Sequence, residues 1–135
     1  MTEAENIAVA NLALEFVNNR EFHRVAEVLL PTFVRHDLVG AYPEVSGANV
    51  TDFLASLIAG APDLSIKSED IIAAGDKVVV RGTLEGTHQG ELFGQPPTGK
   101  PFSVNVINIY RFEDGKIAET WQLQDIAGFT RQIGA

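Results

Sequence analysis

Apolar residues recur at helical spacing in three segments of the first half of the chain. Residues 4–19 carry a wide apolar stripe that opens after Thr2, with acidic residues in the first turn, as is typical of a helix N-terminus. Residues 22–30, which end before Pro31, and residues 50–59 show the same spacing over shorter stretches. The pattern therefore predicts three helices before residue 60.

Apolar and polar positions alternate after Pro62, in segments rich in Val, Ile and Thr. The segments that predict strands are 64–74, 77–87, 102–112 and 116–125, with a short β-leaning piece at 33–38. Helices followed by strands favour an α+β fold in which the N-terminal helices pack on one face of an antiparallel sheet. No repeat or linker interrupts the 135 residues, so we expect a single domain spanning 1–135.

The dipeptide Asp114-Gly115 predicts a two-residue hairpin turn, because a type I′ turn requires positive φ at both central positions. The register then places on one face the pairs Glu113–Lys116, Phe112–Ile117, Tyr110–Glu119, Asn108–Trp121, Val106–Leu123 and Val104–Asp125. This set is bulkier and more apolar than the opposite face, so we expect it to lie beneath the helices. A three-residue loop would instead shift the pairing by one position and place Asn105 or Ile107 opposite Trp121.

Asp125 is the main candidate for a catalytic residue. In the expected register it lies on the inner face beside Trp121 and Leu123, where loss of hydration would raise the pKa of its carboxyl group. A carboxylate with a raised pKa suits general acid/base catalysis near neutral pH. The alternative is that Asp125 only ends the strand and caps the short segment 126–132.

Five other residues are candidates for substrate binding, each with a structural alternative. Trp121 could stack on a planar substrate or fill the core. Asn108 and Tyr110 could bind a carbonyl or enol oxygen, or form hydrogen bonds within the core. His36 could contact a ligand at the mouth of a cavity or hold its loop. His88 could bind substrate, although its glycine-rich neighbours also predict a turn.

Charge and composition remove several classes of partner and chemistry. The net charge is −8 and the ten Lys and Arg residues are scattered, which disfavours nucleic acid. There is no Cys, and three His residues at unrelated spacing predict no metal site. No apolar run reaches the roughly 18 residues of a membrane helix, and the N-terminus lacks a basic signal region. We expect a soluble cytoplasmic protein.

Several motifs together resemble the SnoaL-like polyketide cyclase group, of the ester-cyclase type. They are Gly86-Thr87-His88, Phe93-Gly94-x-Pro96-Pro97-Thr98-Gly99-Lys100, Asp114-Gly115-Lys116-Ile117-x-Glu119-x-Trp121-x-x-x-Asp125, the terminal Gly128 and Gln132, and His36 in Phe33-Val34-Arg35-His36-Asp37. The resemblance covers nearly the whole chain and is most specific in the C-terminal half.

The resemblance implies the cone-shaped α+β fold shared with nuclear transport factor 2 and ketosteroid isomerase, with a pocket between the helices and a curved sheet. It also implies ring closure by intramolecular aldol chemistry on an anthracycline-type methyl ester, without a metal or organic cofactor. The family's catalytic aspartate corresponds to Asp125. The histidine that supports it on the neighbouring strand has no counterpart here, where residues 102–112 offer only Asn105 and Asn108.

The resulting hypothesis is cofactor-independent acid/base catalysis on a small apolar carbonyl compound, as polyketide-type aldol cyclisation or isomerisation. The first alternative is a non-catalytic domain that binds a small apolar or aromatic molecule in the same pocket. A second is epoxide hydrolysis by an Asp-Arg-Asp cluster, with Arg81 or Arg111 as the cation. We also expect a homodimer formed through the outer face of the sheet.

Overall fold

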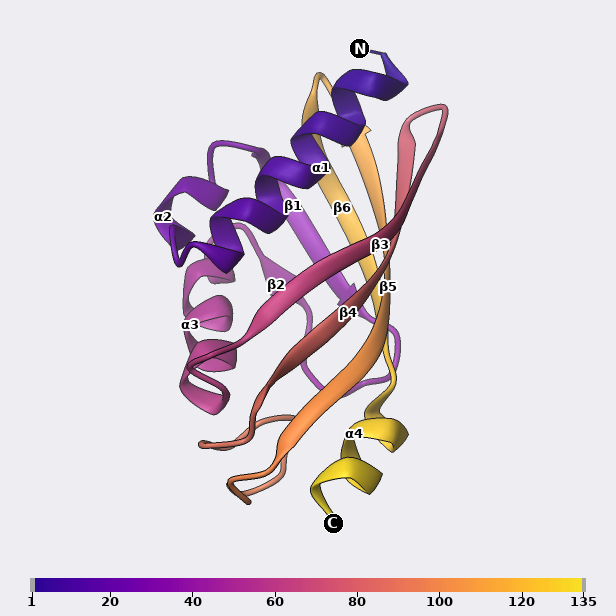
Figure 1. Ribbon diagram of the computed structural model, residues 1–135. Helices are drawn as coiled ribbons and strands as arrows, with labels where there is room; N and C mark the ends of the chain where they lie inside the picture. The colour runs from indigo at the N-terminus through magenta and orange to yellow at the C-terminus, as the bar shows by residue number, and fades with distance from the viewer. Residues whose placement is uncertain (1, 135) are drawn as a thin grey trace.

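The computed structural model of the chain describes residues 2–134 and shows helices packed on a single curved sheet (Figure 1). Its elements are α1 (Glu3–Asn18), α2 (Phe22–Val25), β1 (Leu29–Asp37), β2 (Val45–Ser46), α3 (Val50–Gly60), β3 (Ser65–Ala74), β4 (Lys77–Thr87), β5 (Pro101–Glu113), β6 (Lys116–Gln124) and α4 (Ile126–Ile133). The six strands are ordered β2-β1-β6-β5-β4-β3. All neighbours are antiparallel except β1 and β6, which are parallel. The expected α+β fold is confirmed.

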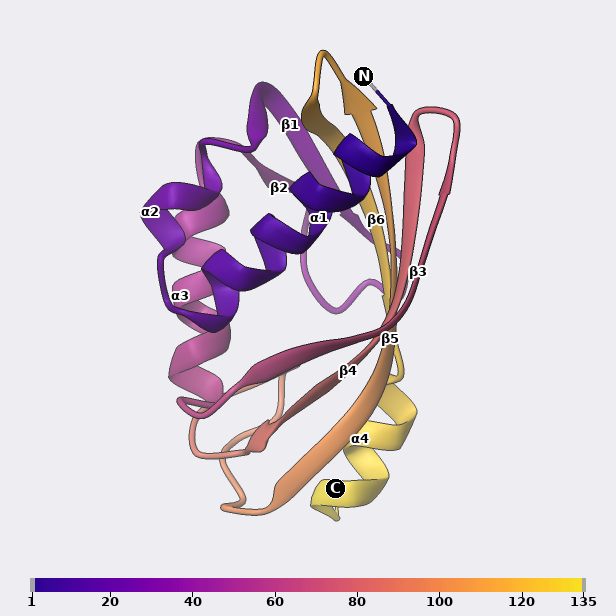
Figure 2. The same ribbon diagram turned by 45° about the horizontal axis from the view of Figure 1, so that its top comes forward.

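Helix α1 crosses the sheet on the same side as α2 and α3 (Figure 2). It begins with a capping box, in which the Thr2 hydroxyl accepts from Glu5 N and the Glu5 carboxylate reaches back to Thr2. At its other end the Asn18 side chain donates to Ile66 O and accepts from Ile66 N, each at 2.8 Å. These two bonds fix the end of α1 against β3. They hold the helix over the sheet, and a pocket lies between the two.

The second helix is shorter than its apolar spacing predicts. It ends at Val25, and the chain enters β1 at Leu29 rather than remaining helical to residue 30. Pro31 disfavours helical geometry at the residue before it. The backbone of Val28 also accepts from Ile117 N at 2.8 Å, which joins this segment to β6. None of the helices in residues 2–134 is long and apolar enough to cross a membrane.

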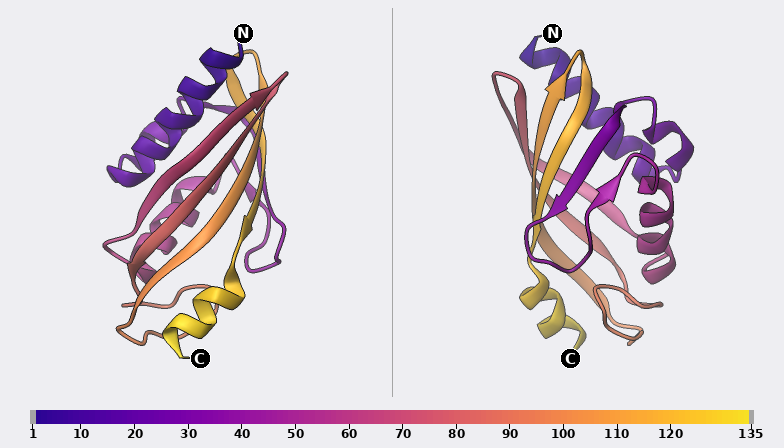
Figure 3. Two further views of the ribbon diagram at one scale, coloured as in Figure 1. Left: turned by 45° about the vertical axis from the view of Figure 1, so that its right-hand side comes forward. Right: turned by 180° about the vertical axis from the view of Figure 1, so that it is seen from behind.

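Two clusters of buried side chains fill the concave face. The first lies between α1, α2, α3 and the sheet and includes Phe16, Leu54 and Tyr110. The second lies at the opposite end of the sheet, where α4 folds back after β6 (Figure 3), and is centred on Phe129. The Phe129 ring is fully buried and meets the rings of Phe102, Phe93 and His88 edge-on.

A β-bulge in β6 changes which residues face the helices. The turn has the expected geometry, with φ of 51° at Asp114 and 76° at Gly115, and Phe112 pairs with Ile117. The next pair is Arg111 with Glu119, so Ala118 is the extra residue of the bulge. One added residue moves every later side chain of the strand to the other face. The expected register is therefore correct at the turn and wrong beyond it.

Candidate active site

A pocket lies between the helices and the concave face of the sheet. Its cavity volume is about 120 Å³, and the total empty space, which includes open solvent at the mouth, is about 700 Å³. Most of its lining is aliphatic or aromatic: Ala13, Leu14 and Val17 of α1, Val25 of α2, Leu29 and Phe33 of β1, Val50, Phe53, Leu54 and Leu57 of α3, Ile66 of β3 and Ile117 of β6. An apolar cavity of about 150 Å³ can hold one benzene molecule, so the volume of this open pocket is close to that of a single-ring site.

Polar side chains converge on the sheet wall of this pocket. They come from three adjacent strands: Arg35 from β1, Asn108 and Tyr110 from β5, and Thr120 and Gln122 from β6. Strict alternation of buried and exposed positions along β5 directs Asn108 and Tyr110 inward. A largely apolar cavity with a few convergent polar groups is the usual form of a small-molecule site.

Tyr110 and Asn108 lie where the sequence placed them, on the helix-covered face. Burial raises the pKa of Tyr110 to about 12, although Arg35 and Asn108 oppose the shift. The Tyr110 hydroxyl is therefore protonated at neutral pH and can donate a hydrogen bond. Asn108 can also donate to a substrate oxygen through its amide, but it cannot carry a proton at this pH. This pair is suited to holding and polarising a carbonyl group.

Trp121 and His36 lie on the opposite, convex face of the sheet, so their expected place in the pocket is wrong. The bulge pairs Trp121 with Ile109 instead of Asn108. His36 is the parallel partner of Trp121 across β1 and β6, and the two rings stack with their centres 5.6 Å apart. A ligand in the pocket would be separated from both rings by the thickness of the sheet.

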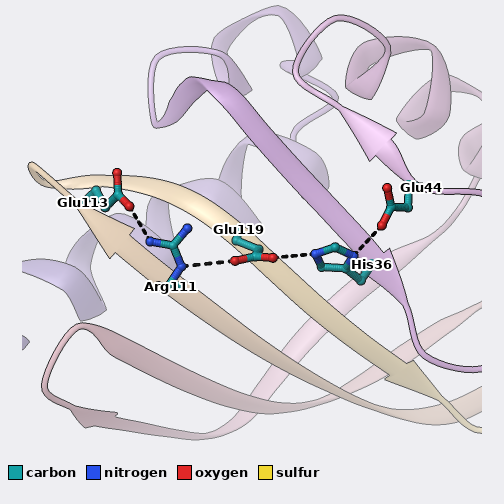
Figure 4. Close-up of polar contacts among 5 residues, drawn as sticks. All are labelled: His36, Glu44, Arg111, Glu113 and Glu119. Carbon is teal, nitrogen blue, oxygen red and sulfur yellow. Dashed lines mark hydrogen bonds and ion pairs between the residues drawn. The ribbon is translucent and has the colours of Figure 1, made fainter.

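His36 belongs to a chain of charged groups on this convex face (Figure 4). Its Nε2 lies 2.6 Å from Glu119 Oε2 and its Nδ1 lies 2.7 Å from Glu44 Oε2. Glu119 also accepts from Arg111 Nε at 3.1 Å, and Arg111 donates to Glu113 at 2.5 Å. Both ring nitrogens can donate to carboxylates only in the protonated imidazole, and the hydrogen bond that His36 donates to Glu119 is the main cause that raises the pKa of His36.

Removing this network should change how stability depends on pH. The raised pKa of His36 implies stabilisation that is complete below its ordinary value of 6.5 and lost as the pH rises through the folded value. The Glu119 pKa is lowered, chiefly by His36, so that contribution is complete above 4.5 and lost as the pH falls through the folded value. We expect His36→Gln to lose less stability than wild type between pH 6 and 9 in urea unfolding. An equal pH dependence of the free energy of unfolding in His36→Gln and wild type would contradict this. The control is His23→Gln, which alters an exposed histidine and should behave as wild type.

Asp125 lies outside the pocket, and its expected inward orientation is wrong. It follows the last residue of β6, and its exposed carboxylate accepts from Gly128 N at 2.9 Å as the N-cap of α4. This is the capping role considered as the alternative from sequence. It lines a shallow convex-face groove with Asn105 and Leu123. Its assignment as the catalytic base rested on this inward placement and on the family resemblance. The structure contradicts the first of these, because Asp125 does not line the pocket.

His88 is fully buried away from the pocket and holds a loop. Its Nε2 lies 3.1 Å from Gln95 O and its Nδ1 lies 3.0 Å from the Thr98 hydroxyl. Its backbone carbonyl accepts from the amides of Thr98 and Gly99. These contacts fasten the loop that carries the Pro96-Pro97 motif, so the turn interpretation fits its surroundings and substrate contact does not.

The sequence analysis also considered metal binding and epoxide hydrolysis, and the structure shows where the residues concerned lie. Among residues 2–134 no group of three or more His, Asp or Glu side chains is placed to hold a metal ion. The two cations considered for epoxide hydrolysis lie outside the pocket, where Arg81 pairs with Asp70 and Arg111 with Glu119.

Comparison with known proteins identifies the family. The family model of the SnoaL-like polyketide cyclases matches residues 7–133. The chain belongs to the SnoaL-like polyketide cyclase family. An aklanonic acid methyl ester cyclase of Streptomyces peucetius is 31% identical over 134 residues, covering 99% of this chain and 86% of that protein. Another, of Streptomyces galilaeus, is 28% identical and is covered to 92%. The structure of TsrD from Streptomyces laurentii superimposes with a TM-score of 0.87 at 27% identity, over 100% of this chain and 98% of the other.

Three polar residues of this SnoaL-like pocket were not found from the sequence. Thr120 and Gln122 became inward-facing only through the bulge at Ala118. The sequence signal was the pair of consecutive apolar residues Ile117 and Ala118, both of which are buried in the structure and break the alternation of the strand. Arg35 could have been found by counting two residues from Phe33, because both point inward from β1.

Proposed function

We propose that this chain binds a small, largely apolar carbonyl compound of the polyketide type and promotes its cyclisation or isomerisation with its own side chains. The observation that supports this most is the convergence of Asn108, Tyr110, Thr120 and Gln122 on one wall of an otherwise apolar pocket. Relatives that align along nearly the whole chain are cyclases of aklanonic acid methyl ester. The cavity volume is close to that of a single-ring site, so a larger substrate would enter by one end and extend through the mouth.

The pocket would promote an aldol ring closure by orientation and by polarisation. Its apolar walls would fold the substrate so that the enol carbon approaches the carbonyl carbon, which lowers the entropic part of the barrier. Donors from Tyr110 and Asn108 would stabilise the negative charge that develops on the carbonyl oxygen. The C–H proton would pass to solvent water and the new alkoxide would take one proton from water, so substrate and product have the same composition. We assign the wall no proton abstraction, because the described lining residues include no carboxylate or imidazole.

The lack of a carboxylate or imidazole among the described lining residues favours a second candidate, a domain that binds such a molecule without converting it. The same apolar walls and donors would then serve affinity and orientation alone. Binding proteins and enzymes can share one pocket on one fold, so the fold does not decide between them.

Incubation with aklanonic acid methyl ester, followed by chromatography and mass spectrometry, tests the proposal. We expect a ring-closed isomer of unchanged mass to form faster than in buffer alone. Saturable binding without any isomer would support the second candidate instead. Neither binding nor product, with this ester or with smaller 1,3-dicarbonyl compounds, would contradict both.

We also propose that the chain forms a homodimer through the convex face of the sheet. Ile107 and Leu123 are paired neighbours there, and their residues remain 42% and 46% exposed. Exposed adjacent apolar residues favour contact with a second copy. Light scattering should give a dimer for wild type and for Leu38→Asp, which alters an exposed loop residue, but a monomer for Leu123→Asp. A monomeric wild type would contradict this proposal.

A further inference from the structure

The wall of the pocket contains a buried cation. Arg35 is 7% exposed and lines the pocket from β1, with its guanidinium carbon 4.5 Å from the centre of the Phe53 ring. Its Nη2 donates to the side-chain oxygen of Gln122. Its Nη1 is buried without a hydrogen-bond partner among the described residues. Burial lowers the pKa of Arg35, yet a guanidinium remains protonated at neutral pH.

The nearest carboxylate, that of the buried Asp37, forms only a long ion pair with this cation. Asp37 Oδ2 lies 4.0 Å from Arg35 Nη1, beyond hydrogen-bond distance. The Asp37 carboxylate accepts instead from the amides of Val39 and Tyr42, each at 3.0 Å, and from the Gln124 amide at 3.3 Å. It therefore holds the loop after β1, and the hydrogen bonds of Arg35 are left incomplete.

Such an arrangement is costly unless a ligand completes it. A buried charge without full hydrogen bonding is unfavourable, and apolar side chains of similar size often pack more stably. Arg35 lies where aliphatic residues form most of the lining, beside the donors of β5 and β6. An anion in this apolar enclosure would interact with the guanidinium more strongly than it would in water.

We propose that Arg35 is the anion-binding residue of this pocket, and that its ligands carry a negative oxygen on an sp² carbon. A carboxylate and the enolate of a 1,3-dicarbonyl compound share this chemistry. The inference rests on the proposed function in placing the substrate in this pocket, and it adds an acidic substrate class to it. No described lining residue is a carboxylate, and the nearest one, Asp37, accepts hydrogen bonds from Val39, Tyr42 and Gln124, although the whole chain carries a net charge of −8. The selectivity is thus local to Arg35.

Single-ring probes of matched shape test the proposal without turnover. Benzoate and benzamide differ in charge but little in size, and both match the cavity volume. We expect calorimetry to give benzoate at least about 10-fold tighter binding than benzamide, as expected for a buried charged hydrogen bond. 4-Nitrophenol is the probe for an enolate, because its anion carries the negative oxygen on an sp² carbon. This anion absorbs visible light, so its titration can be followed directly. Its apparent pKa should fall by about one unit on binding, from the same tenfold preference for the anion.

Substitutions assign the effect to one guanidinium. Arg35→Met should remove both the benzoate preference and the nitrophenol shift, while Arg35→Lys should keep part of each. The matched control is Arg111→Met, which removes an arginine from the convex face of the sheet, opposite the pocket. It should leave the benzoate preference and the nitrophenol shift unchanged. If Arg35→Met fails to fold by circular dichroism, Arg35→Gln replaces it, because it also removes the charge but keeps a polar side chain, and full wild-type selectivity in it would overturn the proposal.

Equal binding of charged and neutral probes by wild type would overturn it, as would no saturable binding of either anion. Unchanged selectivity in Arg35→Met would do the same. Selectivity for benzoate alone supports a carboxylate ligand, and selectivity in both arms supports the shared anionic oxygen. Anion selectivity without cyclisation of any ester would count against the proposed reaction and leave the Arg35 site standing.

Discussion

Tyr110→Phe and Asn108→Leu should each lower turnover of the carbonyl substrate by about 100-fold, mainly through kcat. Removing one preorganised donor from a developing oxyanion typically costs ~10²–10³ in rate. Both side chains line the pocket and lie on the same face of β5. Each change removes a polar group while nearly preserving shape, so the apolar walls should still bind substrate. Steady-state kinetics with the methyl ester measures the effect.

The control for this prediction is Asp125→Asn, which keeps the size of the side chain and an oxygen that can cap α4. We expect its turnover to remain within about threefold of wild type, because that carboxylate lies on the convex side of the sheet. A 100-fold loss in Asp125→Asn, with wild-type rates in both pocket variants, would reverse the assignment of the active face.

Phe129→Ala should produce the largest loss of stability of any single truncation proposed for this chain. The Phe129 ring is 0% exposed and packs edge-on against three other rings, at centre distances of 5.0 to 5.3 Å. Truncating a fully buried Phe costs about 3–5 kcal/mol, from lost burial and from the cavity left behind. For a domain of this size the melting temperature should fall by roughly 10 °C or more.

The exposed Leu38 provides the matched comparison, since Leu38→Ala should shift the midpoint of thermal unfolding by about 2 °C or less. If Phe129→Ala melted within a few degrees of wild type, α4 would not be part of the cooperative core. Turnover at a temperature where the variant is folded should change little, because Phe129 lies in the second cluster and not in the pocket lining.

The sequence predicted the sheet well because strands and tight turns are encoded locally. The four later strands start and end within about two residues of their expected bounds, and Asp114-Gly115 has the positive φ values that its turn requires. The second helix was overextended because helical spacing at 22–30 competes with the pairing of Leu29 to Ile117, which is distant in the chain. A pairing of that kind leaves no mark on local periodicity.

The candidate site was only partly predictable, and one residue explains most of the difference. Ala118 is the extra residue of the bulge, and it reverses the faces of Trp121 and Asp125 relative to an ideal strand. The inward placement of Asn108 and Tyr110 survives because β5 alternates without interruption. Period-two reasoning thus succeeded on the regular strand and failed on its bulged neighbour, and the pocket's Gln122 was overlooked for the same reason.

The central claim is that ligands bind on the helix-covered face of the sheet, and methyl NMR with bound benzoate tests it most directly. Leu14 and Leu54 line the pocket, whereas Ile107 and Leu123 lie on the convex face beside Asp125. We expect intermolecular NOEs from the benzoate ring to the methyl groups of Leu14 and Leu54, and none to those of Ile107 and Leu123. NOEs to Ile107 and Leu123, without any to the pocket methyl groups, would contradict the account.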